Sequence, residues 1–436
     1  MTELLPVMPR YEAYKDSGVA WIGEIPEDWI VNRFKFLVSI KTGEKNTEDK
    51  ETNGLYPFYV RSQIPETINS YSYDGEAILT AGDGAGVGKV YHYVNGKFDY
   101  HQRVYKFSDF KNVIGKYLYR YVSNSFFNVA ILGTAKSTVD SLRLPLIQNF
   151  LICYPTDKNK QIAIANFLDC KTAKIDQAVA IKEKQIRLLK ERKQILIQNA
   201  VTKGLDPNVP MADSGVEWIG QIPAHWKVKR LRFIGKTQNG ISAGADYFGS
   251  GYPFVSYSDV YNNRELPRSV KGLAKSSIND QIHYSVEQGD VLFTRTSETI
   301  EEIGFSSACM ETIPNSTFAG FLIRFRPKPE ILEPGYSKYY FCANMHRAYF
   351  VGKMNIVIRA SLSQELLKNL PVLLPPKKEQ KSIYTHIQTQ STKIDRTIAI
   401  QEQMIEKLKE YKATLINAAV TGKIKVPDPA ENKVVA

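Results

Sequence analysis

The side chains that could do chemistry in this sequence are mainly basic and amide groups in two separate stretches, and that chemistry is binding. The first stretch holds Arg61, Lys89, His101, Gln102 and Arg103, and the second holds Arg264, Arg268, Lys275, Arg295 and Thr296. Arg and Gln can make paired hydrogen bonds to a base edge, whereas Lys mostly neutralises phosphate. We predict that these ten residues contact DNA; the alternative for each is a solvated surface side chain.

Arrangements typical of catalysis or metal binding are absent from the sequence. The six histidines are scattered along the chain, and the four cysteines, Cys153, Cys170, Cys309 and Cys342, lack metal-ligand spacing. We therefore expect reduced thiols in a cytoplasmic protein that has no metal site, no cofactor of its own and no catalytic residue.

A glycine-rich loop at 81–89, AGDGAGVGK, suggests a nucleotide site, but its spacing is wrong for one. In a P-loop, Asp83 would have to be glycine and Val90 would have to carry the magnesium-binding hydroxyl. We interpret the loop as a turn whose bare backbone lets Asp83 and Lys89 approach a surface such as the DNA backbone. A plain turn is the alternative, and an enzyme that uses the loop for nucleotide is a further one.

The distribution of charge favours a polyanionic partner. The net charge is +12, and the excess is +4 in residues 30–156, +6 in 157–205, +5 in 227–374 and +5 in 375–425. This spread predicts nucleic acid before an anionic membrane, because no basic amphipathic helix with aromatic anchors is visible. The first residues lack the features of a signal peptide, and no stretch has the composition of a membrane span.

Two long helices are expected to position these stretches, and they are one element written twice. Residues 174–203 and 393–422 are identical at sixteen of thirty positions, and a helix-forming composition extends over 161–202 and 380–421. A helix of forty residues is about 60 Å long. Such a helix is suited to holding two domains apart.

The apolar spacing predicts that the two helices pack on each other. Steps of four and three residues place Ile175, Val179, Ile186, Leu189 and Leu196 on one seam, and Ile394, Ile398, Ile405, Leu408 and Leu415 on the other. Polar residues interrupt the seams at Lys182, Lys193, Gln401 and Lys412. A narrow sustained seam is typical of helices that pair in a coiled coil.

A shorter repeat precedes each variable part of the chain. Residues 15–29, KDSGVAWIGEIPEDW, and 212–226, ADSGVEWIGQIPAHW, share ten of fifteen residues. We interpret these Trp segments as ordered turns in which Trp21, Trp29, Trp218 and Trp226 pack against a neighbouring element. A docking patch for a partner protein is the alternative.

The variable blocks share a plan of short β-type runs but differ in their loops. The runs lie at 56–60, 76–80, 89–94 and 102–107 in the first block and at 252–257 and 290–296 in the second. Equivalent frames with unrelated loops suit two readers of different short sequences, because base contacts depend on loop side chains. The predicted domains are an N-terminal Trp segment (1–29), a first recognition domain (30–155), a central helical region (156–205), a linker with the second Trp segment (206–226), a second recognition domain (227–374), a distal helical region (375–425) and a tail (426–436).

Several motifs recur in the same order in both halves. They are WIGEIPEDW and WIGQIPAHW, the helix starts CYPTDKNKQIAIANFLD and LLPPKKEQKSIYTHI, KID at 174 and 393, and AVT at 200 and 419. With this duplicated order, the chain resembles the specificity subunit of type I restriction-modification systems. Residues 78–105 are similar to a frequent variant of the first recognition domain. One departure lies at the first helix start, where Pro155, Thr156 and Lys160 replace the family's Pro-Pro and Glu, which the second start keeps as Pro375, Pro376 and Glu379.

The resemblance implies an α+β fold. It has two mixed α/β target-recognition domains, each followed by a long helix, with the helices packed as an antiparallel coiled coil of pseudo-twofold symmetry. The tail sequence GKIKVPDP echoes GLDPNVPM at 204–211, so the N-terminal Trp segment is expected to pack near the chain end.

The function that the resemblance implies is a non-catalytic DNA reader within a larger enzyme. Each recognition domain would read one half of an asymmetric bipartite site, while the helices set the gap and dock two modification subunits. Those partners would carry S-adenosylmethionine and methylate adenine at N6 after flipping the base, and restriction subunits would add ATP- and magnesium-dependent translocation and cleavage. A stand-alone DNA-binding regulator is the main rival.

Overall fold

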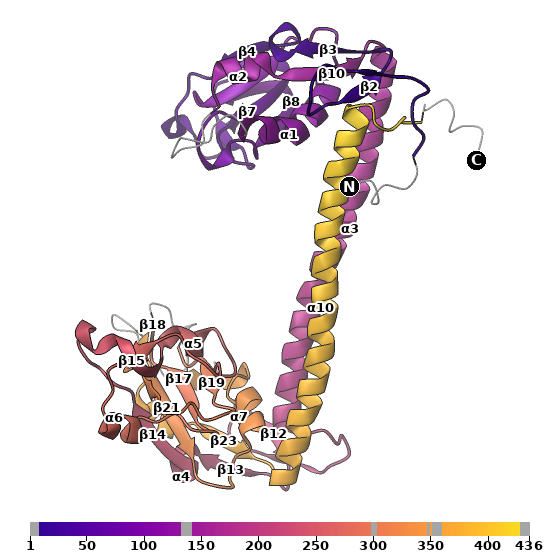
Figure 1. Ribbon diagram of the computed structural model, residues 1–436. Helices are drawn as coiled ribbons and strands as arrows, with labels where there is room; N and C mark the ends of the chain where they lie inside the picture. The colour runs from indigo at the N-terminus through magenta and orange to yellow at the C-terminus, as the bar shows by residue number, and fades with distance from the viewer. Residues whose placement is uncertain (1–7, 132–141, 298–302, 347–348, 351–359, 428–436) are drawn as a thin grey trace. The chain divides into compact units, whose positions relative to one another are not determined.

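The computed structural model describes residues 8–131, 142–297, 303–346, 349–350 and 360–427. The chain divides into two compact units (Figure 1). The first comprises Met1–Glu183 with Glu402–Ala436, and the second comprises Lys184–Gln401. Each unit combines helices with sheets, as expected, and each contains one variable block together with parts of both long helices.

The first unit is built on a six-stranded sheet in the order β4-β9-β7-β8-β5-β6. Its strands are β4 (Ser39–Thr42), β5 (Tyr56–Tyr59), β6 (Glu66–Ile68), β7 (Tyr73–Ala81), β8 (Tyr91–Tyr100) and β9 (Val104–Ser108). Each of the four predicted runs overlaps a strand, although β8 and β9 begin two residues after the predicted starts. Ile78 and Leu79 point to opposite faces of β7 and are both fully buried, so the centre of the sheet is covered on both sides.

The second unit holds a four-stranded sheet, β14-β21-β17-β19, and a three-stranded sheet, β16-β15-β20. Their strands are β14 (Gly235–Asn239), β15 (Phe248–Val255), β16 (Leu273–Ala274), β17 (Val291–Thr294), β19 (Ser306–Ala308), β20 (Thr317–Phe318) and β21 (Leu322–Pro327). The run predicted at 252–257 stops at Val255, because Ser256 caps helix α5 (Tyr257–Tyr261) through a reciprocal hydrogen-bonded pair with Asp259. The run predicted at 290–296 divides into β17 and the two-residue β18 (Thr296–Ser297), which pairs with β22 (Ala360–Ser361).

The same frame encloses both variable blocks. In the first unit β3 (Trp29–Arg33) pairs antiparallel with β10 (Leu151–Pro155), and in the second β13 (Lys227–Arg230) pairs antiparallel with β23 (Pro371–Leu374). Each pair joins the strand that follows or ends a Trp segment to the strand that leads into a long helix. The start and the end of each block are therefore held together, whatever the loops between them contain.

The shorter elements complete the two units. They are β1 (Tyr14–Asp16), β2 (Glu24–Pro26), α1 (Gly115–Ile131), α2 (Leu144–Asn149), β11 (Met211–Asp213), β12 (Gln221–Pro223), α4 (Leu231–Ile234), α6 (Ile278–His283), α7 (Pro334–Tyr340) and α9 (Gln364–Lys368). Single 3-10 turns lie at Phe34–Phe36, Thr47–Asp49, Gly84–Gly86 and Ala245–Tyr247.

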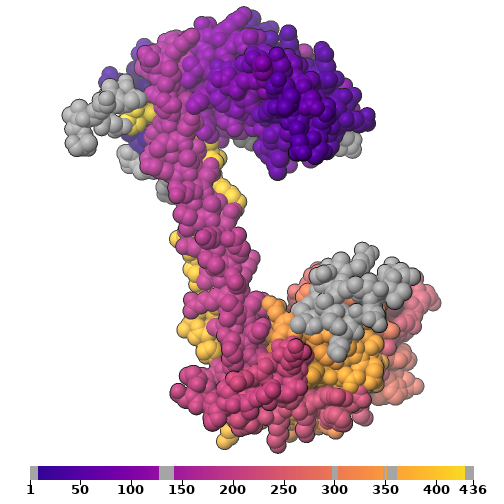
Figure 2. Space-filling model, turned by 180° about the vertical axis from the view of Figure 1, so that it is seen from behind, coloured from indigo at the N-terminus to yellow at the C-terminus, as the bar shows by residue number. Residues whose placement is uncertain are grey.

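The repeated sequences form the long helices α3 (Lys158–Lys203) and α10 (Lys377–Val420), which lie side by side in both views (Figures 1 and 2). All ten predicted seam residues are buried or half-buried, whereas most other side chains along these helices are exposed. Both helices begin three residues before the predicted start. The residues of the two predicted seams are thus less exposed than most of each helix, and their pairing in a coiled coil stays a prediction.

Two of the four polar interruptions, Lys193 and Lys412, contact the opposite helix. In the first unit Lys412 Nζ lies 2.7 Å from both carboxylate oxygens of Asp176. In the second unit Lys193 Nζ lies 2.6 Å and 2.8 Å from the carboxylate oxygens of Asp395. The two aspartates are the last residues of the two KID motifs, and the two lysines are equivalent residues of the repeat. The lysines thus provide ionic contacts between the helices at places where apolar residues are missing.

The Trp segments pack, as predicted, against neighbouring elements. Trp29 is fully buried and Trp226 nearly so. Trp21 stacks on Phe150 with ring centroids 5.5 Å apart, and Trp218 lies against Tyr349 at 5.7 Å. The packing interpretation of these segments is confirmed.

The end of each long helix packs on a Trp segment. After α10, Tyr14 Oη donates to Gly422 O at 3.1 Å, and Ile424 shares a core with Trp29, which confirms the expected contact with the chain end. After α3, a Cβ on Gly204 would lie 3.3 Å from the Trp226 ring, so the chain passes close to this side chain. Gly204 and Gly422 have φ of +73° and +71°, the left-handed conformation in which glycine ends a helix without strain.

Candidate nucleic-acid interface

The residues predicted in the first block lie on three loops that meet at one place. Arg61 follows β5, Asp83 follows β7, and Arg103 lies between β8 and β9. Arg61 Nη1 is 2.9 Å from Asp83 Oδ1, and Arg103 Nη1 is 2.5 Å from Asp83 Oδ2. Gln63 Nε2 donates to Lys89 O at 2.6 Å, which ties the loop of Arg61 to the loop of Lys89. We call Arg61, Asp83 and Arg103 the Asp83 cluster.

The Asp83 cluster presents its two cations to solvent. The arginine side chains are 42% (Arg61) and 58% (Arg103) exposed, whereas that of Asp83 is 20% exposed. Partial burial acts to raise the pKa of Asp83, but hydrogen bonds from Arg103 and Arg61 outweigh it, so the pKa lies below its ordinary value. The carboxylate is therefore ionised at neutral pH, and the cluster carries one net positive charge.

His101 is the exception among the predicted contacts of this block. Its side chain is 4% exposed, and its Nδ1 accepts a hydrogen bond from the backbone N–H of Arg103 at 3.0 Å. Burial and the neighbouring Arg61 and Arg103 lower the pKa of His101, which favours the neutral ring that can accept this bond. A ring held in this way presents little surface to a ligand, so we leave His101 out of the contacts proposed below, and its predicted DNA contact stays untested. His101 instead shapes the turn that carries Arg103.

Gln102 and Lys89 are exposed and remain predicted contacts. The Gln102 side chain donates to Asn46 Oδ1, which brings a fourth loop to the same place. Sequence analysis missed Asn46, because nothing in its local pattern links it to a residue more than fifty positions away.

The glycine-rich loop serves the protein's own packing. A Cβ on Gly86 would lie 2.5 Å from the carbonyl oxygen of Arg61, and one on Gly84 would lie 3.5 Å from the Arg61 guanidinium. The bare backbone therefore lets Arg61 come close to the loop. The interpretation of Asp83 as facing an external surface is corrected, because its carboxylate faces the two arginines.

The residues predicted in the second block are not joined in a comparable cluster. Arg268 is 84% exposed and its guanidinium lies 2.9 Å from Glu311, while Lys275 is exposed. Arg295 is half-buried, with Nη1 3.5 Å from Gly320 O, and Thr296 pairs with Ser361 in the short β18–β22 ladder. Arg264 is half-buried and lines a separate pocket of about 290 Å³.

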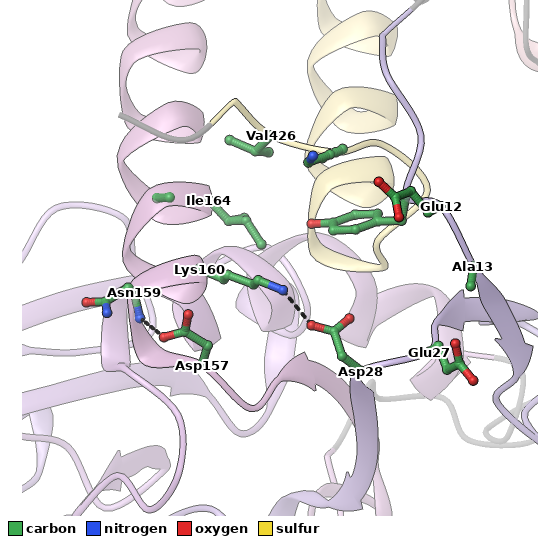
Figure 3. Close-up of a pocket in the computed structure, with 12 residues that line it drawn as sticks. Glu12, Ala13, Glu27, Asp28, Asp157, Asn159, Lys160, Ile164 and Val426 are labelled. Atoms are coloured by element: carbon green, nitrogen blue, oxygen red, sulfur yellow. Dashed lines mark hydrogen bonds and ion pairs between the residues drawn. The ribbon is translucent and has the colours of Figure 1, made fainter. Parts of the chain in front are cut away.

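At the start of α3, Lys160, which replaces the family's Glu, pairs with an aspartate. Here a pocket of about 570 Å³ is lined by Glu12, Glu27 and Asp28 among others, and Lys160 Nζ lies 2.6 Å from Asp28 Oδ2 (Figure 3). Trp29, the next residue, is buried, and its Nε1 has no acceptor within the described part of the chain.

At the start of α10 the carboxylate is on the helix, not on the Trp segment. Glu379 Oε1 accepts a hydrogen bond from Trp226 Nε1 at 3.1 Å, and Glu379 Oε2 lies 2.8 Å from His225 Nε2. His225 and Glu379 occupy the positions that Asp28 and Lys160 hold in the first copy. The departure at Lys160 is therefore matched by a change in its partner.

Other kinds of site receive no support from the described residues. Residues 8–131, 142–297, 303–346, 349–350 and 360–427 contain no group of three or more His, Cys, Asp and Glu side chains suited to a metal ion. Over the same ranges no helix has the length and apolarity needed to cross a membrane. All four cysteines are free.

Comparison with known proteins identifies the family. The model of the type I restriction modification DNA specificity domain matches residues 26–190 and again residues 223–410. The chain belongs to this family. The type I specificity family is non-catalytic, and the resemblance seen in the repeated motifs is confirmed. A stand-alone regulator is not favoured, because both matched segments and their order are those of a type I specificity subunit.

Similar type I specificity subunits match either nearly the whole chain or a part of it. The type I restriction enzyme MjaVIII specificity subunit of Methanocaldococcus jannaschii is 23% identical over 432 residues, covering 92% of this chain and 94% of that protein. The EcoDI specificity subunit of Escherichia coli is 27% identical over 179 residues, covering 41% and 39%.

Solved structures show the same fold. The HsdS subunit from Thermoanaerobacter tengcongensis has a TM-score of 0.53 at 16% identity, covering 91% of this chain and 98% of that chain. A chain from a study of complex assembly and conformational transition of the type I R-M system has a TM-score of 0.70 at 14% identity, with the same coverage.

Proposed function

We propose that each recognition domain of this specificity subunit reads one half of an asymmetric, two-part DNA site. The observation that carries the proposal is the double family match, since each matched segment contains one variable block within the same pair of frame strands. Sequence is read by loop side chains at base edges, whereas the frame only positions them. Two different loop sets on one frame therefore suit two different half-sites.

The proposed DNA contacts are the predicted residues that the structure leaves accessible. In the first domain they are Arg61, Lys89, Gln102 and Arg103, and in the second they are Arg264, Arg268, Lys275, Arg295 and Thr296. The support in the first domain is the convergence of four loops on one place. In the second domain the support is residue type, together with exposure and charge at Arg268 and Lys275. These are weaker grounds, because surface cations are common.

We propose further that α3 and α10 form an antiparallel coiled coil with approximate twofold symmetry. The support is reciprocal: Asp176 contacts Lys412, and Asp395, which is the repeat equivalent of Asp176, contacts Lys193, the equivalent of Lys412. The pair would set the length of the unread gap and dock two modification subunits. Those subunits would carry S-adenosylmethionine and methylate adenine at N6, and restriction subunits would supply the ATP- and magnesium-dependent steps, in the cytoplasm.

Methylation mapping of the host DNA, with and without this gene, tests the proposal. The expected result is a set of methylated adenines within one asymmetric two-part motif, which disappears when the gene is deleted. A methylome that does not change on deletion, or a lost motif that is continuous, would contradict it. Mapping with either recognition domain replaced by one from a relative adds a second check, since only the corresponding half of the motif should change.

The rival functions have separate tests. A stand-alone regulator would bind its site tightly as the purified chain, without modification subunits. An enzyme that uses the glycine-rich loop would bind ATP or S-adenosylmethionine saturably in equilibrium dialysis of this chain. We expect weak DNA binding and no such nucleotide binding by the chain alone.

A further inference from the structure

In the Asp83 cluster, two arginines share one carboxylate. Two guanidiniums from loops more than forty residues apart bind different oxygens of one carboxylate, at 2.9 Å for Arg61 and 2.5 Å for Arg103. Each uses Nη1 for this contact. Neither guanidinium has another hydrogen-bond acceptor in the described part of the chain, so the remaining N–H groups of both forks are available.

The backbones that carry the two arginines are fixed as well. Arg103 O accepts from Gly82 N at 2.8 Å, and Arg103 N donates to His101 Nδ1 at 3.0 Å. The carbonyl of Arg61 lies against Gly86, where any side chain would collide with it. The glycine-rich loop and the buried His101 thus fix the backbones of the two arginines, and Asp83 binds their side chains.

An arginine that reads a base must have its guanidinium correctly oriented. Arginine reads guanine by placing two N–H groups of its planar fork on O6 and N7, which requires a set orientation of the guanidinium. A free arginine side chain loses rotamer entropy when it is ordered, at the expense of affinity. A carboxylate bound to one side of the fork orders the side chain before DNA arrives. It also halves the net charge of the arginine pair, which makes the cluster less suited to simple phosphate attraction.

We propose that Asp83 is a positioning residue that orients Arg61 and Arg103 to read guanine in the half-site of the first recognition domain. This inference rests on the proposed function, because it assumes that this domain reads a half-site. It adds the chemical identity of the base and a residue that acts on specificity without touching DNA.

The test uses the full chain in complex with its modification subunits, and duplexes that carry the mapped site with each base pair of both half-sites replaced in turn. Asp83→Asn keeps the size of the side chain but removes its charge. In this variant we expect discrimination at the guanines of the first half-site to fall by about tenfold. Affinity for unrelated DNA should stay equal or rise, because a negative charge has been removed. Discrimination across the second half-site should not change.

Two further variants separate orientation from general damage. Glu66→Gln is the matched control, since it also converts a carboxylate to an amide in the first recognition domain, in a surface pair with Lys50 at 3.4 Å. It should leave discrimination unchanged. Arg61→Lys and Arg103→Lys keep the charge but lose the fork, so each should reduce guanine discrimination.

The outcomes that would overturn the inference differ from those that would overturn the proposed function. If the wild-type complex shows no preference at the first half-site, the proposed function fails. If the wild type discriminates and Asp83→Asn discriminates equally well, only the positioning role fails. A first half-site without any G·C pair would also overturn the inference, as would a Glu66→Gln variant that loses as much discrimination as Asp83→Asn.

Discussion

Arg295 is the residue whose predicted contact in the second domain is most open to a direct test. Its side chain is half-buried, with Nη1 near Gly320 O, so its position is more restricted than that of a fully exposed arginine. If it reads a base, Arg295→Ala should weaken binding to the cognate second half-site by about 1–3 kcal/mol. Affinity measurements on second half-site variants check this, with first half-site variants as the control. An unchanged affinity across all second half-site variants would remove Arg295 from the interface.

His346 should make the second unit sensitive to acid. Its ring is buried, Nε2 donates to Tyr340 O at 2.9 Å, and Nδ1 has no partner among the described residues. Burial lowers the pKa of His346 to about 4. Because the unfolded chain binds the proton more tightly, this contribution to stability is full above about pH 6.5 and is lost as the pH falls toward 4.

The expected size of the His346 effect is about 3 kcal/mol between pH 7 and pH 4. Urea unfolding of the wild type and of His346→Gln across this range measures it. Carboxylates titrate in both proteins, so the quantity to compare is the unfolding free energy of the wild type minus that of His346→Gln. This difference should fall as the pH falls, because only the wild type loses the contribution of His346. Parallel pH profiles for the two proteins would show that the ring is not the titrating group.

At the scale of the elements, the ionic contacts between α3 and α10 predict coupled substitutions. Lys193→Asp puts two carboxylates next to each other at Asp395, and Lys193→Asp with Asp395→Lys restores the opposite charges. We expect the double variant to recover about 1 kcal/mol of unfolding free energy relative to the sum of the single variants, since both side chains are partly solvated. Urea unfolding of the four proteins gives this coupling energy.

A pair that does not cross between the helices provides the control. Lys409 and Glu406 lie 3.1 Å apart on the exposed face of α10. Exchanging their charges should change the unfolding free energy by no more than a few tenths of a kcal/mol. If Lys193 and Asp395 show no more coupling than this control pair, their contact does not help to hold the helices together.

At the scale of the whole molecule, the helices should control the unread gap without affecting the half-sites. Insertion of seven residues at equivalent positions of both helices keeps the seam in register and lengthens each by about 10 Å, which is roughly three base pairs of DNA. Methylation mapping should then find both half-sites unchanged and a longer gap. Altered half-site letters with an unchanged gap would refute this division of labour.

The sequence alone determined the repeated elements of this protein and their order. The two long helices, the packing of the Trp segments and four strands of the first block were predictable, because periodic apolar residues and repeats report local structure and burial directly. The family was also predictable, since the motifs recur in a fixed order in both halves. The helices begin three residues before the predicted starts, and the run at 290–296 is divided into two strands. Capping and sheet pairing determine such limits, and the sequence pattern does not report them.

Only the tertiary structure decided how the site is assembled. Arg61 and Arg103 could be chosen by residue type, but their shared contact with Asp83 depends on the strand order that brings three loops together. His101 was chosen by residue type as well, because sequence does not report that its side chain is buried. Lys160 likewise departs from the family's Glu for a reason that only the fold shows, since it lies beside Asp28, which is more than a hundred residues away in the sequence. Long-range pairing of polar groups leaves no periodic signal, so it becomes visible only when the chain is folded.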